Sequence, residues 1–220
     1  MKRQTCCFWE CNWKVNMELK ENNRDKQLRI KTDGRDDINS DEFRFPYEPT
    51  PYAVLQRLAE SELILKGDTV LDYGCGKGRV SFFLSKVTNA NCIGIEYDER
   101  IYRSAVSNQK SALSKARTEF VLTSAEEYEV PPEVNRCYFF NPFSVEILRR
   151  VMAKIEKSYY ENPREILLFF YYPSDDYMCY LMTVDELEFY DEIDCDDLFS
   201  TQDPRERIMV FGFSDYEFEE

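Results

Sequence analysis

Short apolar runs alternate with segments of helical periodicity along most of the chain. Apolar runs of strand length favour strands in a covered sheet, whereas apolar residues three and four positions apart favour helices packed against it. The runs predict seven strands, at residues 69–73, 91–96, 118–122, 137–140, 166–172, 187–193 and 208–213. The periodic segments predict helices that begin near residue 51 and that span residues 79–87, 98–115 and 145–159.

This order of elements predicts an α/β fold: a seven-stranded, mostly parallel, doubly wound sheet with helices on both faces. Repeated strand–helix alternation gives parallel strands joined by right-handed crossovers. The last two predicted strands have no convincing helix between them, so we expect the last strand to run antiparallel. In sheets of this kind, ligands bind beyond the carboxyl ends of the strands, where the strand order reverses.

The segment before the predicted sheet is polar and has little apolar periodicity. We therefore expect residues 1–45 to form a mobile or irregular N-terminal arm, and residues 46–220 to form one domain. Prolines keep the chain extended up to Pro51. Thr50 is the candidate N-cap of the helix that follows, with Pro51 in its first turn.

The composition excludes several classes of chemistry. The chain has no histidine, so neither a Ser-His-Asp nor a Cys-His arrangement can form. Cys6, Cys7 and Cys11 include no Cys-x-x-Cys pair, so we expect no metal site. The sequence contains no apolar run of transmembrane length and no signal-peptide core, which predicts a cytoplasmic protein without a membrane partner.

The negative charge is concentrated near the C-terminus. Residues 174–220 hold 16 acidic side chains against Arg205 and Arg207, which accounts for the whole net charge of −14. Duplex nucleic acid requires a cationic face, so this composition disfavours such a partner unless another subunit supplies the charge. An acidic end suits a basic protein segment or an amine, although a solvated acidic surface is the simpler alternative.

Three glycines at alternate positions follow the first predicted strand, in the stretch VLDYGCGKGRV. Gly74, Gly76 and Gly78 lack a Cβ and tolerate positive φ, so a ligand can lie directly against the backbone. The next helix presents free N–H groups there. A dinucleotide fingerprint requires glycine where this chain has Arg79, so that interpretation is rejected. A purely structural turn remains the alternative.

Two carboxylates flank this loop and suggest the chemistry of its ligand. Glu96 ends the second predicted strand, where a carboxylate accepts hydrogen bonds from two ribose hydroxyls. Asp72 precedes the glycines and suits a cationic amino group, or else it caps the adjacent loop. A ligand with an amino group at one end and an unphosphorylated ribose in the middle is S-adenosylmethionine.

The segments LDYGCGKGR, GIEYDERIYRSA, LTSAEEY and FFNPF occur in the order typical of class I S-adenosylmethionine-dependent methyltransferases, which the chain resembles over about residues 50–213. Many members have Asp at the position of Ser124, where it bonds the adenine amino group; here either Ser124 or Glu126 is the candidate. The YEPTPY segment resembles a stretch that closes over the cofactor in several such enzymes. The resemblance implies a cofactor site formed by Asp72, Gly74, Gly76, Gly78, Glu96, Tyr97, Ser124, Ala125, Glu126 and Asn141.

The Asn-Pro-Phe stretch after the fourth predicted strand is the candidate catalytic motif. Asn141 offers an amide oxygen to a target N–H, Pro142 holds a turn with its carbonyl exposed, and Phe143 offers a ring face to a planar base or a cationic amine. The motif resembles a shortened Asn-Pro-Pro-Tyr of enzymes that methylate adenine and glutamine amino groups. A related turn occurs in the non-SET histone lysine methyltransferases. A structural turn with Phe143 in the core is the alternative.

The resemblance therefore implies methyl transfer to a nitrogen of a protein side chain or a small amine. Two alternatives remain open at this point. One is methylation of an adenine-type amino group in a nucleic acid. The other, of a different class, is a regulatory module that binds S-adenosylmethionine without catalysis.

Overall fold

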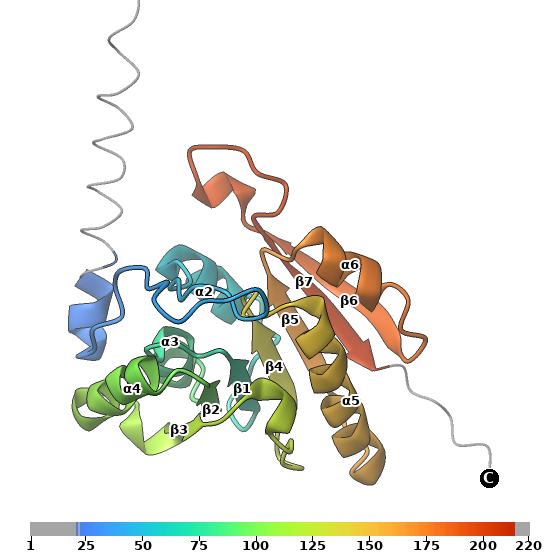
Figure 1. The fold of residues 1–220 in the computed structure, drawn as a ribbon. Coiled ribbons are helices and arrows are strands. Elements are labelled where there is room, and N and C mark those ends of the chain that lie inside the picture. The colour runs from blue at the N-terminus through green and yellow to red at the C-terminus, as the bar shows by residue number, and fades with distance from the viewer. Residues whose placement is uncertain (1–20, 22, 214–220) are drawn as a thin grey trace, which may run out of the picture.

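The computed structural model describes residue 21 and residues 23–213 of the chain. Their central element is a seven-stranded sheet with the order β3-β2-β1-β4-β5-β7-β6 (Figure 1). Only β7 runs against its neighbours, because it pairs antiparallel with both β5 and β6 while the other pairs are parallel. The strands are β1 (Thr69–Tyr73), β2 (Asn91–Glu96), β3 (Thr118–Leu122), β4 (Arg136–Phe139), β5 (Leu167–Tyr171), β6 (Leu187–Asp194) and β7 (Arg207–Phe213). The predicted fold class is confirmed, and each predicted strand lies within one residue of the observed one.

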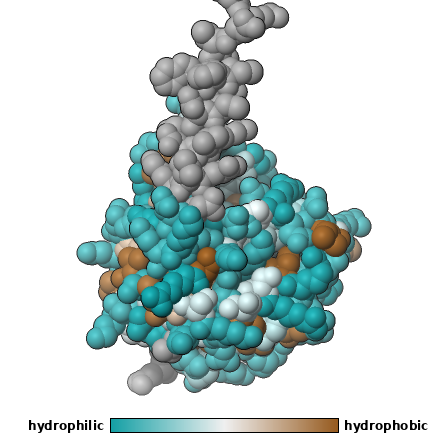
Figure 2. All heavy atoms as spheres, turned by 90° about the vertical axis from the view of Figure 1, so that its left-hand side faces the viewer, coloured by the Kyte–Doolittle hydropathy of each residue, from teal (hydrophilic) through white to brown (hydrophobic). Residues whose placement is uncertain are grey.

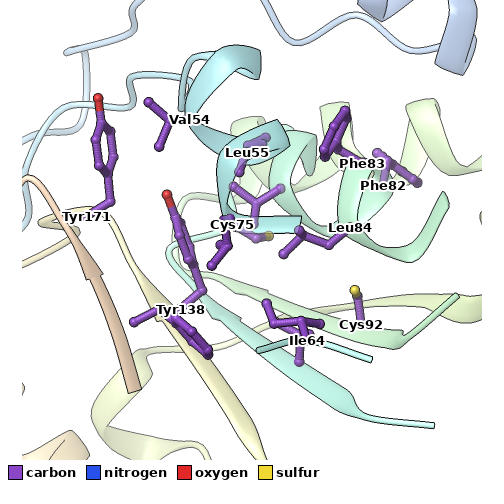
Figure 3. Close-up of a cluster of buried hydrophobic side chains, with 14 of the residues drawn as sticks. Val54, Leu55, Ile64, Cys75, Phe82, Phe83, Leu84, Cys92, Tyr138 and Tyr171 are labelled. Atoms are coloured by element: carbon purple, nitrogen blue, oxygen red, sulfur yellow. The ribbon is translucent and has the colours of Figure 1, made fainter. Parts of the chain in front are cut away.

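Helices cover both faces of the sheet. They are α2 (Tyr52–Glu60), α3 (Arg79–Val87), α4 (Glu99–Ser111), α5 (Val145–Glu161) and α6 (Asp175–Leu181). Apolar side chains of α2, α3 and α4 pack on one face, and those of α5 and α6 pack on the other. Successive strand residues alternate between the two cores: Val70 joins the first and Leu71 the second. Figure 3 shows part of the first core, which contains Leu55 of α2, Phe83 of α3 and strand side chains such as Tyr138.

Three helical predictions need correction. Pro51, not Thr50, is the N-cap of α2; the hydroxyl of Thr50 instead lies 3.1 Å from that of Tyr138. The predicted helix at residues 98–115 ends at Ser111, although Asp98 does cap its start by accepting a hydrogen bond from the Arg100 N–H. Helix α6 was not predicted, because seven residues are too few to display a helical period. Between β3 and β4 the described chain forms only a short 3-10 turn, Ala125–Glu127, rather than an α-helix.

The described part of the predicted arm lies against the domain together with the residues that join it to α2, and from here on the arm means residue 21 and residues 23–50. Residues 23–28 are helical, and residues 29–50 run irregularly across the carboxyl ends of β2, β1 and β4 (Figure 1). Asn39 donates to Asp98 after β2, and Arg44 forms an isolated β-bridge with Phe143 after β4. The mobility predicted for residues 1–20 falls outside the described residues, and the domain boundary at residue 45 stays a prediction.

The arm and α4 share a largely hydrophilic face. Figure 2 shows this face, on which hydrophobic side chains occur singly or in small groups among polar ones. Among residue 21 and residues 23–213, no helix is long and apolar enough to cross a membrane. The same residues contain no cluster of Cys, Asp and Glu that could hold a metal ion. Cys6, Cys7 and Cys11 lie outside this range, so the prediction made for them is not addressed.

Candidate functional site

The glycine loop after β1 and the acidic tip of β2 are joined by hydrogen bonds. The backbone N–H of Gly76 donates to Oε2 of Glu96 at 3.0 Å, and the N–H of Asp98 donates to Oε1 of the same carboxylate at 2.9 Å. The Cys75 N–H donates to the Ile95 carbonyl oxygen at 3.0 Å. The two predicted segments therefore lie together at the carboxyl edge of the sheet, where the strand order reverses between β1 and β4.

The two loop positions nearest to this contact require glycine. Gly74 has φ +69° and Gly76 has φ +57°, values that side chains with a Cβ rarely adopt. A Cβ on Gly74 would lie 2.5 Å from Cβ of Pro142, and a Cβ on Gly76 would overlap the ring of Tyr47. The bare backbone thus makes room for Pro142 and for the arm. At Gly78, φ is +88° and a Cβ would lie against rings of the core.

Asp72 is a buried carboxylate that the structure leaves without a cationic partner. Its Oδ2 accepts a hydrogen bond of 2.7 Å from the Ser81 hydroxyl, and its side chain is only 2% exposed. Burial, together with the nearby Glu96 carboxylate, raises the pKa of Asp72 to about 7. Among the described residues no basic side chain forms an ion pair with it. A cation bound beside Asp72 would relieve the desolvation of this carboxylate.

A cavity lies between the arm and these strand ends, with a volume of about 80 Å³. Its walls include six of the predicted cofactor-binding positions as well as arm residues between Asp36 and Thr50. Those six are Asp72, Gly74, Glu96, Tyr97, Ala125 and Glu126, whereas Gly76, Gly78, Ser124 and Asn141 do not line it. Ligand pockets usually measure about 300–1,000 Å³. The arm therefore fills part of the space that a nucleoside-sized ligand requires.

Arg44 of the arm contacts Glu126, one of the two candidates for the adenine contact, and Tyr97, another predicted cofactor-binding residue. Its guanidinium donates to Oε1 of Glu126 at 2.9 Å and lies over the ring of Tyr97, 5.0 Å from the centroid. Tyr97 also donates its hydroxyl proton to the Asn39 carbonyl oxygen. Glu126 and Tyr97 are thus held by the arm, while Ser124 precedes the short 3-10 turn as its N-cap residue.

The Asn-Pro-Phe turn differs from its prediction in two respects. The carbonyl oxygen of Pro142, expected to be exposed, accepts a hydrogen bond from the Phe45 N–H at 3.2 Å. Phe143, expected to offer its face to a substrate, is 4% exposed and packs edge-on against Tyr73 and Phe139. The Pro142 carbonyl is occupied because the arm pairs with this turn. The Phe143 ring is buried because it completes the core on the α5 side of the sheet.

Asn141 is oriented by the turn that follows β5. Its amide nitrogen donates to the Tyr172 carbonyl oxygen, and its amide oxygen accepts from the Ser174 N–H at 3.3 Å. Both Asn141 and Tyr172 have positive φ, at 39° and 50°. Such strain in non-glycine residues gathers at functional sites more often than elsewhere. The catalytic role of Asn141 stays a prediction.

Arg79 has a larger structural role than its sequence position indicated. The residue is 3% exposed and fixes the arm to the start of α3. Its Nε donates to the Thr32 hydroxyl at 2.7 Å, and its guanidinium forms ion pairs with Glu21 and Asp25. The sequence did offer a signal for this role: a bulky cation beside the glycines of a loop, with acidic residues upstream of them.

Comparisons with known proteins agree with this geometry. Residues 64–160 match a family described as a methyltransferase domain. A protein-lysine N-methyltransferase from Saccharolobus islandicus (strain REY15A) is 36% identical over 64 residues, which are 29% of this chain and 40% of that protein. A ribosomal protein L11 methyltransferase from Xanthomonas campestris pv. campestris (strain 8004) is 30% identical over 70 residues, which are 32% of this chain and 23% of that protein. The match thus spans less than half the length of either relative.

Solved structures share the whole fold. The crystal structure of an RNA methyltransferase from Salinibacter ruber, in complex with S-adenosyl-L-homocysteine, superimposes with a TM-score of 0.52 at 18% identity. The alignment covers 79% of this chain and 98% of that one. At that identity the likeness concerns the fold.

Residues 64–160 are thus similar to a methyltransferase domain, and the sheet order is that of the Rossmann-like class I S-adenosylmethionine-dependent methyltransferase fold.

Proposed function

We propose that this protein transfers a methyl group from S-adenosylmethionine to a nitrogen of a protein side chain or a small amine. The observation that carries the cofactor assignment is Asp72, a buried carboxylate with no cationic partner among the described residues, on the wall of the cavity beside the glycine loop. The α-amino group of S-adenosylmethionine is a cation of suitable size for that position.

The chain's own residues fit the other parts of the cofactor. Each oxygen of Glu96 accepts one backbone N–H and keeps a lone pair that can accept from a ribose hydroxyl. Glu126 and Tyr97 would face the adenine once Arg44 withdraws. When bound, the cofactor supplies a methyl group that its sulfonium has already activated, so the protein has mainly to align the acceptor and exclude water.

Nitrogen is the favoured acceptor on two grounds. The Asn-Pro-Phe turn resembles the motif of enzymes that methylate amino groups, and Asn141 is oriented by its bonds to the β5–α6 turn. The protein-lysine N-methyltransferase relative is consistent with a protein substrate. A nucleic-acid base is the second candidate, supported by the Asn-Pro motif and by the RNA methyltransferase from Salinibacter ruber that shares the fold, but opposed by the net charge of −14.

Two measurements test the proposal. Titration calorimetry with S-adenosylmethionine and S-adenosylhomocysteine measures cofactor binding by the full chain. Incubation with tritiated S-adenosylmethionine and cell lysate, followed by separate counting of protein, RNA and small-molecule fractions, identifies the acceptor class. Label in the protein or small-amine fraction supports the proposal, label only in RNA supports the second candidate, and binding without label anywhere supports a non-catalytic module.

A further inference from the structure

A second cavity lies beside the cofactor cavity, and the two share several lining residues. It has a volume of about 420 Å³, and we call it the acceptor cleft. Phe45, Pro46, Glu48 and Pro49 of the arm and Phe140 after β4 line both cavities. A group bound in the cleft is therefore adjacent to the space assigned to the cofactor. Asn141, which does not line the cofactor cavity, lines the acceptor cleft.

Aromatic side chains form much of the cleft. Phe140 and Tyr171 pack at 4.6 Å between ring centroids, with Tyr172 next to them along the chain and Phe199 across the cleft. Tyr171 projects from its strand toward the side of the sheet that carries α2, as does Tyr138 (Figure 3). Surfaces of this kind accommodate the aliphatic stem of a long cationic side chain and attract its charged end.

The cleft carries a net negative charge, because two of its charged residues neutralise each other and the third is acidic. Arg35 and Glu48, which both line it, pair with each other at 3.5 Å. Glu206 also lines the cleft and accepts a hydrogen bond of 2.6 Å from the Tyr171 hydroxyl. No ion pair to Glu206 occurs within the described part of the chain. Burial, with the neighbouring Asp203, raises the pKa of Glu206, as expected for a carboxylate that lacks a cation.

The rim of the cleft already holds one cation in this manner. The guanidinium of Arg205 lies over the Tyr172 ring, 4.5 Å from its centroid, and donates to Asp203 at 3.1 Å. Residues 194–206, which include Phe199 and Glu206 of the cleft, carry five acidic side chains against Arg205 alone. Asp197 pairs with Arg57 and Asp203 with Arg205, so the other three acids provide charge complementary to basic residues near the acceptor.

We propose that the acceptor cleft takes the side-chain amine of a lysine within a basic segment of a protein. This inference rests on the proposed function and adds the acceptor site, its specificity residue and the substrate class. Lysine is favoured over arginine because the acceptor must lose a proton before it can attack, and the ammonium loses it more readily than the guanidinium.

The roles in the cleft follow from this assignment. The lysine stem lies along Phe140 and Tyr171, and Glu206 attracts the ammonium and accepts one of its protons. The nitrogen lone pair then forms a bond to the methyl carbon while the carbon–sulfur bond breaks and leaves its electron pair on sulfur. The products are methyl-lysine and S-adenosylhomocysteine, and the proton held by Glu206 passes to solvent.

The test compares Glu206→Gln with Glu188→Gln in the full chain. The first replacement removes the charge at the cleft but keeps an oxygen that can accept from Tyr171. The second removes the same charge from an exposed position on β6 that does not line the cleft. Substrates are lysate protein and synthetic peptides with one lysine flanked by arginines or by glutamates. Methylated residues are identified by mass spectrometry, and KM, kcat and the cofactor Kd are measured for both variants.

We expect methyl-lysine in the labelled protein and preference for the arginine-flanked peptide. Glu206→Gln should raise KM for the acceptor by about tenfold or more, with an unchanged cofactor Kd, since a charged hydrogen-bonding partner is lost. Glu188→Gln should change neither constant. Where no peptide is accepted, the rate of lysine labelling in lysate protein is compared between the two variants instead.

Two outcomes would overturn this inference and leave the proposed function intact: methylation of a nitrogen other than that of lysine, or equal KM values for Glu206→Gln and the unaltered chain. Failure of the full chain to bind S-adenosylmethionine would instead overturn the proposed function itself.

Discussion

The backbone N–H of Gly76 and the Glu96 carboxylate share a hydrogen bond of 3.0 Å, so the loop after β1 and the tip of β2 form one unit. The other carboxylate oxygen of Glu96 accepts a hydrogen bond from the backbone N–H of Asp98, so both oxygens are held by neutral backbone amides. The carboxylate is thereby oriented before any ligand arrives, and this reduces the conformational entropy that binding has to remove.

Replacement of this acid should weaken cofactor binding. Glu96→Ala removes the acceptor of two backbone N–H groups and of the ribose hydroxyls, which we expect to cost about 1–3 kcal/mol of binding free energy. Calorimetric titration with S-adenosylhomocysteine measures the change. Glu99→Ala, at an exposed position in the first turn of α4, is the matched control and should bind normally. Equal affinity of the two variants would remove Glu96 from the site.

Cofactor affinity should depend on pH through Asp72. Below its pKa of about 7 this side chain is neutral and cannot attract the amino group of the cofactor. Affinity should therefore increase as the pH rises toward 7 and level off above it, with proton release on binding below that point. Titrations from pH 5.5 to 8.5 in buffers of different ionisation enthalpy measure both effects. The same pH profile in Asp72→Asn would show that another group is responsible.

The ligand-free protein should show the opposite trend in stability. The pKa of Asp72 in the fold lies above its ordinary value of 3.8, so the fold favours the protonated carboxyl. The contribution of this residue to the free energy of unfolding therefore declines as the pH rises between about 4 and 7. Asp72→Asn should flatten that part of the profile.

The contact between the arm and the glycine loop can be tested with two alanines. Gly76→Ala should destabilise the fold more than Gly34→Ala does. Both residues have positive φ, at +57° and +81°, but only a Cβ on Gly76 would overlap Tyr47, whereas Gly34 has open space around it. The shared backbone strain costs about 1–2 kcal/mol. Thermal melts measure the excess, and hydrogen exchange of residues 36–50 reports whether the arm is displaced. Equal losses would argue against this contact.

Removal of the buried guanidinium should release the arm. Arg79→Met leaves Glu21 and Asp25 without their cation, and loss of one partner from a buried ion pair typically costs about 3–5 kcal/mol. We expect a lower melting temperature and faster proteolysis between residues 21 and 50. Arg103→Met removes an exposed pair with Glu99 on α4, which contributes about 0.5 kcal/mol at most. Proteolysis at the same rate in both variants would contradict the role given to Arg79.

Asn141→Ala should slow turnover without weakening cofactor binding. The residue lines the acceptor cleft but not the cofactor cavity, so the cofactor Kd should stay unchanged while kcat declines. A melt of the variant checks the β5–α6 turn, because the amide also bonds Tyr172 and Ser174. Asn135→Ala, remote from both cavities, is the control. Full turnover in Asn141→Ala would end its assignment as a catalytic residue.

The sequence alone was sufficient to predict the sheet and the position of the glycine loop against Glu96. Strands β1, β2 and β3 and helix α3 begin and end at the predicted residues, because each is an uninterrupted local pattern bounded by polar residues or glycine. The proximity of Gly76 to Glu96 follows from parallel neighbours, whose carboxyl ends must share an edge.

The contacts of the arm could not be predicted in the same way. Arg79 forms an ion pair with Asp25, Gly76 leaves space for the Tyr47 ring, and the Pro142 carbonyl accepts a hydrogen bond from Phe45. Each pair joins residues far apart in the sequence. Local periodicity carries no information about such pairs, and a polar segment without a pattern resembles an unstructured one. The hydrogen bond to the Pro142 carbonyl was missed for this reason, whereas burial of Phe143 in the core had been the alternative to its role in binding substrate.

The lining that Phe45, Pro46 and Pro49 share between the two cavities has a kinetic consequence. Because these residues line both cavities, a displacement of this segment would change the cofactor site and the acceptor cleft at the same time. The rates at which cofactor and acceptor bind would then be coupled through one short stretch of chain.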